Sequence, residues 1–206
     1  MRKEYIWEIK ARNTPLLKRK CNHCDSDRFY CSDKFRMNAQ KKHIDIWLIY
    51  RCKKCDNTYN MTIFSRTKPE LINKDLFNKF SENNAEIAWK YAFSHEISRK
   101  NNVELDFSSV KYDIQYDNIS VGDILNFNCD IVTFKIKYPF NFSLKLSSVI
   151  RMCLKLSANK LNKLIEAKVI SIQGKNLQRK QKVKNEDIVQ VNREKLRSIY
   201  NKWFRE

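Results

Sequence analysis

Alternating apolar residues predict β-strands in two long parts of the chain. The first part is residues 44–63, and the second runs from residue 110 to residue 142 with a turn at 121–123. A period of two places alternate side chains on one face of a sheet. In the first part the intervening residues include Trp47 and Ile49, so we expect another module to dock on the second face; the ordinary strand propensity of Trp and Ile is the alternative explanation. In the second part the aromatic residues could stack bases, but we favour core packing.

Apolar residues spaced three and four apart predict helices elsewhere. Two helices are expected within residues 70–99, interrupted near 81–84. Residues 145–155 and 157–167 predict a second pair, with Ser157 as the N-cap of the latter. Short strands at 170–172 and 188–191 follow, and a helical stripe closes the chain after residue 191. That last helix could lie on a membrane surface, but we favour docking on the rest of the protein.

Together these elements predict an α+β protein built from three modules. Residues 1–68 form a β module, residues 69–142 form a connecting segment with a helical pair and strands, and residues 143–206 form two helices, a small sheet and a C-terminal helix. A chain of 206 residues suits several small modules better than two large domains.

Two Cys-x-x-Cys pairs give the first candidate site. Cys21 and Cys24 form one pair, and Cys52 and Cys55 form the other. Four thiolates can surround one zinc ion tetrahedrally and leave no position open for water, so the spacing predicts one structural zinc ion in a zinc ribbon. We expect His23 to lie near the metal without binding it.

The spacing between the pairs leaves alternatives open. The 27 intervening residues exceed the usual gap of about 15–20, so long strands or an insertion must fill it. A reducible dithiol is the main alternative to zinc, although a redox pair is typical of a βαβ context and this region is predicted to be all strand.

The other cysteines and the apolar runs bear on the compartment. Cys31, Cys129 and Cys153 have no partner by any spacing rule, which favours a reducing, cytoplasmic location. No apolar run reaches the roughly 20 residues of a membrane span, and the first residues lack the apolar core of a signal peptide. We therefore expect no membrane partner.

The net charge of +18 is unevenly distributed. Residues 1–68 carry 17 Lys and Arg against 7 Asp and Glu, residues 69–142 carry 8 against 11, and residues 143–206 carry 16 against 5. Two basic modules on a near-neutral spacer would suit a polyanion held between them.

Basic residues off the apolar stripes of the helices at 145–167, and in the segment that follows, give the second candidate site. They could contact RNA phosphates, or they could only solubilise an apolar helix pair while RNA lies on ribbon residues such as Lys41, Lys42, Lys53 and Lys54. The candidate RNA-binding residues are Lys145, Arg151, Lys155, Lys160, Lys163, Lys168 and Lys175.

The C-terminal module resembles the S-four RNA-binding domain, named for a small-subunit ribosomal protein. Lys145-Leu146-Ser147 stands where that domain opens on Arg-Leu-Asp, Ser157 stands at its second helix start, and Ile170-Ser171-Ile172-Gln173-Gly174-Lys175 follows its Val-x-Val-Asn-Gly-Lys run. Lys168 and Glu186 replace two glycines of the pattern. The resemblance implies an S-four-like two-helix and small-sheet module that binds structured RNA.

Nearly the whole chain resembles the bacterial domain-of-unknown-function family numbered one thousand and sixty-two. The resemblance rests on Asn13-Thr14-Pro15, the two cysteine pairs, residues 34–39, residues 46–50 and the C-terminal stretch. The family implies an architecture and no activity.

Three functions follow from these features. The favoured one is a non-catalytic, zinc-stabilised RNA-binding protein that recognises ribosomal or transfer RNA, with the ribosome as a candidate partner. The second is an enzyme that modifies or processes RNA, although no paired carboxylates, phosphate loop or nucleophile and base are spaced for catalysis. The third is a zinc-ribbon adaptor for acidic proteins or a DNA-binding regulator.

Overall fold

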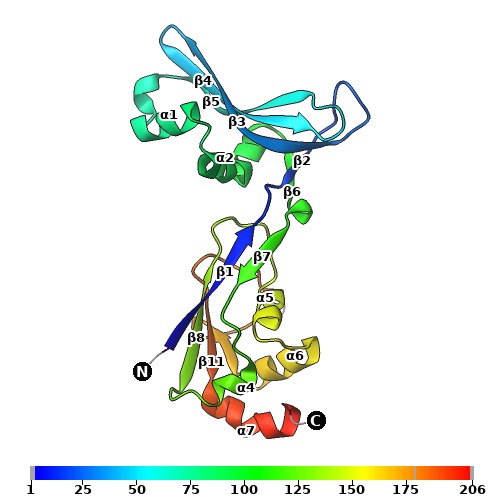
Figure 1. Ribbon diagram of the computed structural model, residues 1–206, viewed down its shortest axis with the longest axis vertical. Helices are drawn as coiled ribbons and strands as arrows, with labels where there is room; N and C mark the ends of the chain where they lie inside the picture. The colour runs from blue at the N-terminus through cyan, green and yellow to red at the C-terminus, as the bar shows by residue number, and fades with distance from the viewer. Residues whose placement is uncertain (1–2, 179, 205–206) are drawn as a thin grey trace. The chain divides into compact units, whose positions relative to one another are not determined.

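The chain folds into two compact units in a computed structural model that describes residues 3–178 and 180–204. Residues 11–111 form one unit, here called the inserted unit (Figure 1). Residues up to Lys10 and from Tyr112 onward form the other, here called the terminal unit. These boundaries differ from the expected modules 1–68, 69–142 and 143–206, because the first strand pairs with strands more than 100 residues away.

The inserted unit, all of whose residues are described, is built on an antiparallel sheet in the order β5-β4-β3-β2-β6. The alternation expected around residues 44–50 is confirmed, since Ile46, Leu48 and Tyr50 are fully buried on one face. Its strands are β2 (Leu16–Lys18), β3 (Arg28–Gln40), β4 (His43–Cys52), β5 (Thr58–Thr67) and β6 (Glu104–Asp106).

Helices from the middle of the chain cover the buried face of this sheet. Phe80 and Ala88 belong to the same apolar core as Leu48, and Figure 1 shows α1 and α2 along one side of the strands. We expected two helices in residues 70–99, but Ser94 caps a third short one. The helices are α1 (Lys74–Ser81), α2 (Ala85–Ala92) and α3 (His95–Lys100), preceded by the 3-10 turn η1 (Pro69–Leu71).

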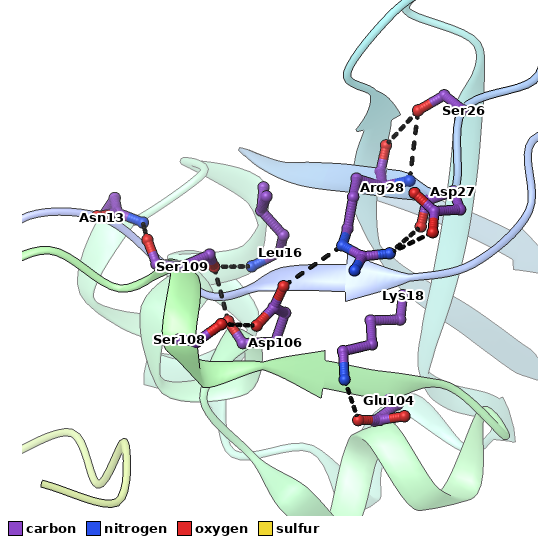
Figure 2. A network of polar contacts seen from close by, with 10 residues as sticks. All are labelled: Asn13, Leu16, Lys18, Ser26, Asp27, Arg28, Glu104, Asp106, Ser108 and Ser109. Atoms are coloured by element: carbon purple, nitrogen blue, oxygen red, sulfur yellow. Dashed lines mark hydrogen bonds and ion pairs between the residues drawn. The ribbon is translucent and has the colours of Figure 1, made fainter.

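A polar network ties together the two ends of the inserted unit (Figure 2). Asp106 accepts hydrogen bonds from Ser108 Oγ at 2.5 Å and from Arg28 Nε at 3.3 Å. Ser109 Oγ accepts the backbone N–H of Leu16 at 2.9 Å, and Asn13 Nδ2 donates to the Ser109 carbonyl at 3.1 Å. The segment that enters the unit and the segment that leaves it are therefore joined by hydrogen bonds at several positions.

The terminal unit holds a mixed sheet in the order β10-β9-β11-β8-β1-β7 within the described residues. Tyr5 of β1 lies opposite Phe134 of β8 in a parallel pair, and Val189 of β11 lies opposite the same Phe134 in an antiparallel pair. The strands are β1 (Lys3–Ala11), β7 (Tyr112–Gln115), β8 (Ile131–Lys137), β9 (Ile170–Ile172), β10 (Lys175–Asn176) and β11 (Ile188–Asn192).

Three of the alternating aromatic residues, Phe134, Tyr138 and Phe142, are buried in the core as expected, whereas Tyr112, Tyr116 and Phe140 are half-buried. Trp7 and Phe134 are buried and stack with ring centroids 4.6 Å apart. The strand expected to reach residue 142 ends at Lys137, because Pro139 has no N–H to continue a ladder. Tyr138 still closes the core, where its hydroxyl accepts the backbone N–H of Phe142 at 2.7 Å.

The helices of the terminal unit follow the expected order. Residues 121–123, expected as a turn, instead begin a short helix that Ser120 and Asp123 cap reciprocally. Leu196 of the last helix is fully buried, as docking on the rest of the protein requires. The side chains of Trp203 and Phe204, part of the expected stripe, lie outside the described residues. The helices are α4 (Val121–Ile124), α5 (Leu146–Cys153), α6 (Ala158–Glu166) and α7 (Arg193–Phe204).

Candidate metal centre and basic helices

The four cysteines predicted as metal ligands come together at one end of the inserted sheet. Their Sγ atoms all lie within 4.8 Å of one another. Two of these separations join the pairs: Cys21 Sγ and Cys55 Sγ are 3.6 Å apart, and Cys24 Sγ and Cys52 Sγ are 3.5 Å apart. Such a cluster of thiols could hold a metal ion.

The two pairs share two kinds of backbone hydrogen bond. The N–H of His23 donates to Cys21 Sγ at 3.4 Å, and the N–H of Lys54 donates to Cys52 Sγ at 3.5 Å. In each turn the N–H of the first cysteine also donates to the carbonyl five residues later, in both cases at 2.8 Å. The N–H groups of His23 and Lys54, which donate to sulfur, place partial positive charge there and favour the thiolate form.

The second pair is fixed by the sheet itself. Cys52 is the last residue of β4 and is fully buried, and the N–H of Lys53 donates to the Arg28 carbonyl at 3.0 Å. Lys54 Nζ lies 2.5 Å from Asp25 Oδ1 and links the second turn to the first, although both side chains are mostly exposed and the ion pair adds little stability.

The protonation of the thiols is uneven. Burial raises the pKa of Cys52, but hydrogen bonds from the backbone N–H groups of Cys55 and Lys54 outweigh it and lower the pKa to about 6. The backbone N–H of Ser26 lowers the pKa of Cys24, yet burial and the neighbouring thiols together raise it to about 12. A bound metal ion would have to displace protons from the thiols with raised pKa values, so metal binding at this cluster depends on pH.

The other thiols and the nearby histidine are not part of the cluster. His23 is exposed and lies outside the ligand group found among the described residues. Cys31 and Cys153 are buried, and burial raises the pKa of both, that of Cys153 to about 12. Cys129, in the terminal unit, is half-buried. The unusual gap between the two cysteine pairs is filled by the long β3–β4 hairpin.

The seven basic residues predicted to bind RNA all belong to the terminal unit. Six of them lie on α5 and α6 or directly beside these helices, and Lys175 lies on β10; all are exposed except Lys160, which is half-buried. Arg151 Nε donates to the Leu156 carbonyl at 3.4 Å, so this guanidinium also supports the turn between the helices. Their assignment as contacts for RNA stays a prediction.

Two of these lysines occupy backbone positions that usually suit glycine. Lys155 and Lys168 have φ values of 52° and 54°, directly after the ends of α5 and α6. After α6 the N–H of Lys168 donates to the Ile165 carbonyl and the N–H of Val169 donates to the Leu164 carbonyl, both at 2.9 Å. These two bonds define a Schellman ending, in which a left-handed residue satisfies the last carbonyls of a helix.

The residues that carry the S-four resemblance adopt the expected order of helix, helix, strand, turn and strand. Both glycine replacements are left-handed, since Glu186 has a φ of 68° in addition to Lys168. Gln173 and Gly174, with φ values of 48° and 77°, form the two-residue turn between β9 and β10. However, β11 continues onto β8 and β1, so these strands belong to a larger sheet that includes the N-terminal strand.

Sequence reasoning missed the network around Asp106 and the three-dimensional neighbours of the alternating residues in β4. Partners of Asp106 lie 78 residues before it and two residues after it, and no local pattern indicates them. The outward-facing residues of β4 gave a signal, because Trp47 and Ile49 are unusually apolar, but the sequence does not show which residues of β3 flank them.

Comparisons with known proteins identify a family without a described activity. The family model described as "Protein of unknown function (DUF1062)" matches residues 37–176. No curated protein and no solved structure matches the chain. No helix in the described part of the chain is long and apolar enough to span a membrane. Because the match covers more than half of the sequence, this chain belongs to the DUF1062 family.

Proposed function

We propose that Cys21, Cys24, Cys52 and Cys55 bind one structural zinc ion in a zinc-ribbon module. A zinc–sulfur distance of about 2.3 Å implies tetrahedron edges of about 3.8 Å. The separations of 3.5 and 3.6 Å between the pairs are close to such edges. Four protein ligands fill the coordination sphere, so the ion would stabilise the fold and would activate no water.

A dithiol redox site is less well supported by this arrangement. A redox pair works between the two cysteines of one Cys-x-x-Cys motif. Here thiols of different motifs also lie close together, Cys21 with Cys55 at 3.6 Å and Cys24 with Cys52 at 3.5 Å. Interleaved pairs of this kind suit one shared ion.

We further propose that the protein is a non-catalytic RNA-binding protein that recognises structured RNA, such as ribosomal or transfer RNA. The observation that carries this proposal is the set of basic side chains on and next to α5 and α6, all exposed except the half-buried Lys160, within a chain of net charge +18. Recognition through phosphates requires accessible Lys and Arg and tolerates many sequences. The S-four-like order of elements and the glycine-like backbone of Lys168 and Glu186 add support.

Both structural units are basic. The inserted unit holds 20 Lys and Arg against 12 Asp and Glu, and the terminal unit holds 21 against 11. The near-neutral segment 69–142 is therefore divided between two basic units and does not form a separate spacer. A polyanion could contact either unit.

Nucleic acid that co-purifies with the full chain tests the RNA proposal. We expect a high ratio of absorbance at 260 nm to 280 nm that falls after ribonuclease treatment and persists after deoxyribonuclease treatment. The reverse sensitivity would indicate a DNA-binding regulator. Absence of co-purified nucleic acid, together with no binding of transfer RNA at low salt, would contradict the proposal and favour a protein adaptor. Cleavage or modification of the recovered RNA would indicate the enzymatic alternative.

A further inference from the structure

One face of the inserted sheet is left uncovered by its own helices. Residues that alternate with the buried ones point away from α1 and α2, and cross-strand partners share that face. We call this set the outer sheet face. It consists of Tyr30, Lys34 and Arg36 of β3 and Trp47, Ile49 and Arg51 of β4.

The strand register arranges these six residues in three rows. Arg36 lies opposite Trp47, Lys34 lies opposite Ile49, and Tyr30 lies opposite Arg51. Each row therefore joins one apolar side chain to one cation. A bulge adds two residues to β3 between Cys31 and Lys34. Because the number of added residues is even, side chains before and after the bulge keep the same alternation between the two faces of the sheet.

Apolar side chains are unusual on the open face of an antiparallel sheet, where polar residues are the rule. Tyr30 is 37% exposed, and Trp47 and Ile49 are partly exposed. On β5, the strand on the other side of β4, the partner of Trp47 is Thr62 and the partner of Ile49 is Asn60. Neither partner adds a large apolar side chain to this face.

The cations of the outer sheet face are not neutralised by neighbouring carboxylates. None of the ion pairs among the described residues includes Lys34, Arg36 or Arg51. The adjoining part of the same sheet differs, because Lys18 pairs with Glu104 and Arg28 pairs with Asp106. Asp45, the carboxylate on the same side of β4, accepts the backbone N–H of Arg66 at 2.8 Å.

We propose that the outer sheet face binds a single-stranded segment of RNA, with bases stacked on Trp47 and Tyr30 and phosphates held by Lys34, Arg36 and Arg51. This rests on the proposed function in taking RNA as the ligand, and it adds a second surface on the other unit. Aromatic rings beside cations suit a ligand that alternates flat apolar groups with anions, which is the chemistry of nucleotides. An acidic protein would use the cations but would leave the rings unmatched.

The cysteine cluster supports the geometry of this face. Arg51 directly precedes Cys52, and Tyr30 donates from its hydroxyl to Asp56 Oδ1 at 2.8 Å, one residue after Cys55. The row that joins Tyr30 and Arg51 is therefore attached at both ends to the second cysteine turn. Loss of a metal ion from the cluster should weaken binding at this face more than binding at α5 and α6.

The test is the affinity of the metal-loaded full chain for a labelled 12-nucleotide uridine RNA, measured by fluorescence anisotropy. Trp47→Leu keeps an apolar side chain but removes the ring, and we expect it to weaken binding at least about fivefold, as the loss of one stacked base implies. Trp47→Phe, which keeps a ring, should bind nearly as well as the unmodified protein. The double variant Lys34→Ser with Arg36→Ser should weaken binding. It should also reduce the slope of log binding constant against log salt concentration by roughly 0.7 for each phosphate that is no longer neutralised.

Matched controls separate this surface from the general charge of the protein. Lys74→Ser with Lys90→Ser removes two exposed lysines from the helices on the opposite face of the sheet and should leave the affinity unchanged.

Three results would overturn the inference. Trp47→Leu could bind as tightly as the unmodified protein, an acidic polyglutamate peptide could compete as well as RNA, or the unmodified protein could bind transfer RNA but no uridine RNA. In the last case the proposed function would stand and this surface would fail. Binding of neither RNA would reject both.

Discussion

Lys168 and Glu186 show how single residues carry backbone geometry that glycine would supply more easily. The chain contains two glycines, and the described residues with positive φ are mostly Asp, Asn and Lys. A left-handed backbone costs a residue with a Cβ roughly 1–2 kcal/mol. The comparison with the S-four pattern anticipated both positions, because it marked them as places where glycine had been replaced.

Replacing Lys168 by Gly should therefore stabilise the protein. We expect a gain of about 0.5–1 kcal/mol in the free energy of unfolding, because relief of backbone strain exceeds the entropy that glycine adds to the unfolded chain. The measurement is the midpoint urea concentration of unfolding, compared between proteins that share the same m-value. Lys163→Gly makes the same chemical change inside α6 and should destabilise by about 1 kcal/mol. A change in the free energy of unfolding that has the same sign in both variants would contradict this explanation.

The cysteine cluster makes a second prediction at the scale of residues. Cys52→Ser should lose the metal and unfold the inserted unit, because structural zinc contributes about 10–16 kcal/mol to the folding of small sites. Circular dichroism and elemental analysis of the purified variant give the readout. Cys129→Ser, in the other unit, should keep one metal ion per chain. A folded Cys52→Ser protein with stoichiometric zinc would rule out a structural role.

The uneven thiol pKa values predict how metal affinity changes with pH. The pKa of Cys24 is raised to about 12. The backbone N–H of Asn57 lowers the pKa of Cys55, but burial and the thiols of Cys21 and Cys52 raise it overall. Both thiols are protonated near neutral pH without metal, so binding must release at least two protons and should strengthen at least about 100-fold per pH unit. Competition with a chromophoric chelator between pH 6.5 and 7.5 measures this slope, and an affinity that stays constant would disagree with the assignment.

At the scale of elements, β4 was predictable and β8 was only partly so. Strict alternation in β4 specified its buried face, since a period of two leaves no other register. In β8 the aromatic alternation continued past the real end of the strand, because Tyr138 and Phe142 are buried in a loop that follows Pro139. Burial produces the same pattern of apolar residues in both cases, and only the missing N–H of proline marked the difference.

Neighbouring residues of β4 test the assignment of its two faces. Leu48 is fully buried under the helices, and Leu48→Ala should cost about 2–5 kcal/mol because it removes buried apolar area and leaves a cavity. Ile49 faces the other way and is partly exposed, so Ile49→Ala removes less buried apolar area and should cost less than Leu48→Ala. Chemical denaturation of both variants measures the difference. If the two costs were equal, the second face would be as deeply covered as the first.

At the scale of the whole molecule, the division into units was not predictable from local patterns. Charge and periodicity suggested boundaries at residues 68 and 142, whereas the units meet at residues 10–11 and 111–112. The pairing of Tyr5 with Phe134 and the hydrogen bond from Asn13 to the Ser109 carbonyl decide this, and both depend on contacts between distant parts of the chain. The clustering of the four cysteines was predictable, because the two Cys-x-x-Cys spacings suggest a common site whatever path the intervening chain takes.

The salt dependence of transfer RNA binding tests the central claim most directly. For the metal-loaded chain, the logarithm of the binding constant should fall linearly with the logarithm of salt concentration, and Lys160→Ala with Lys163→Ala should flatten that slope by roughly 1.4–1.8 if both lysines contact phosphates. The variant should melt like the unmodified protein, and Lys74→Ala with Lys90→Ala should keep the full slope. A slope and an affinity unchanged in the α6 variant would contradict the account, because the basic helices would then contribute no contact to RNA.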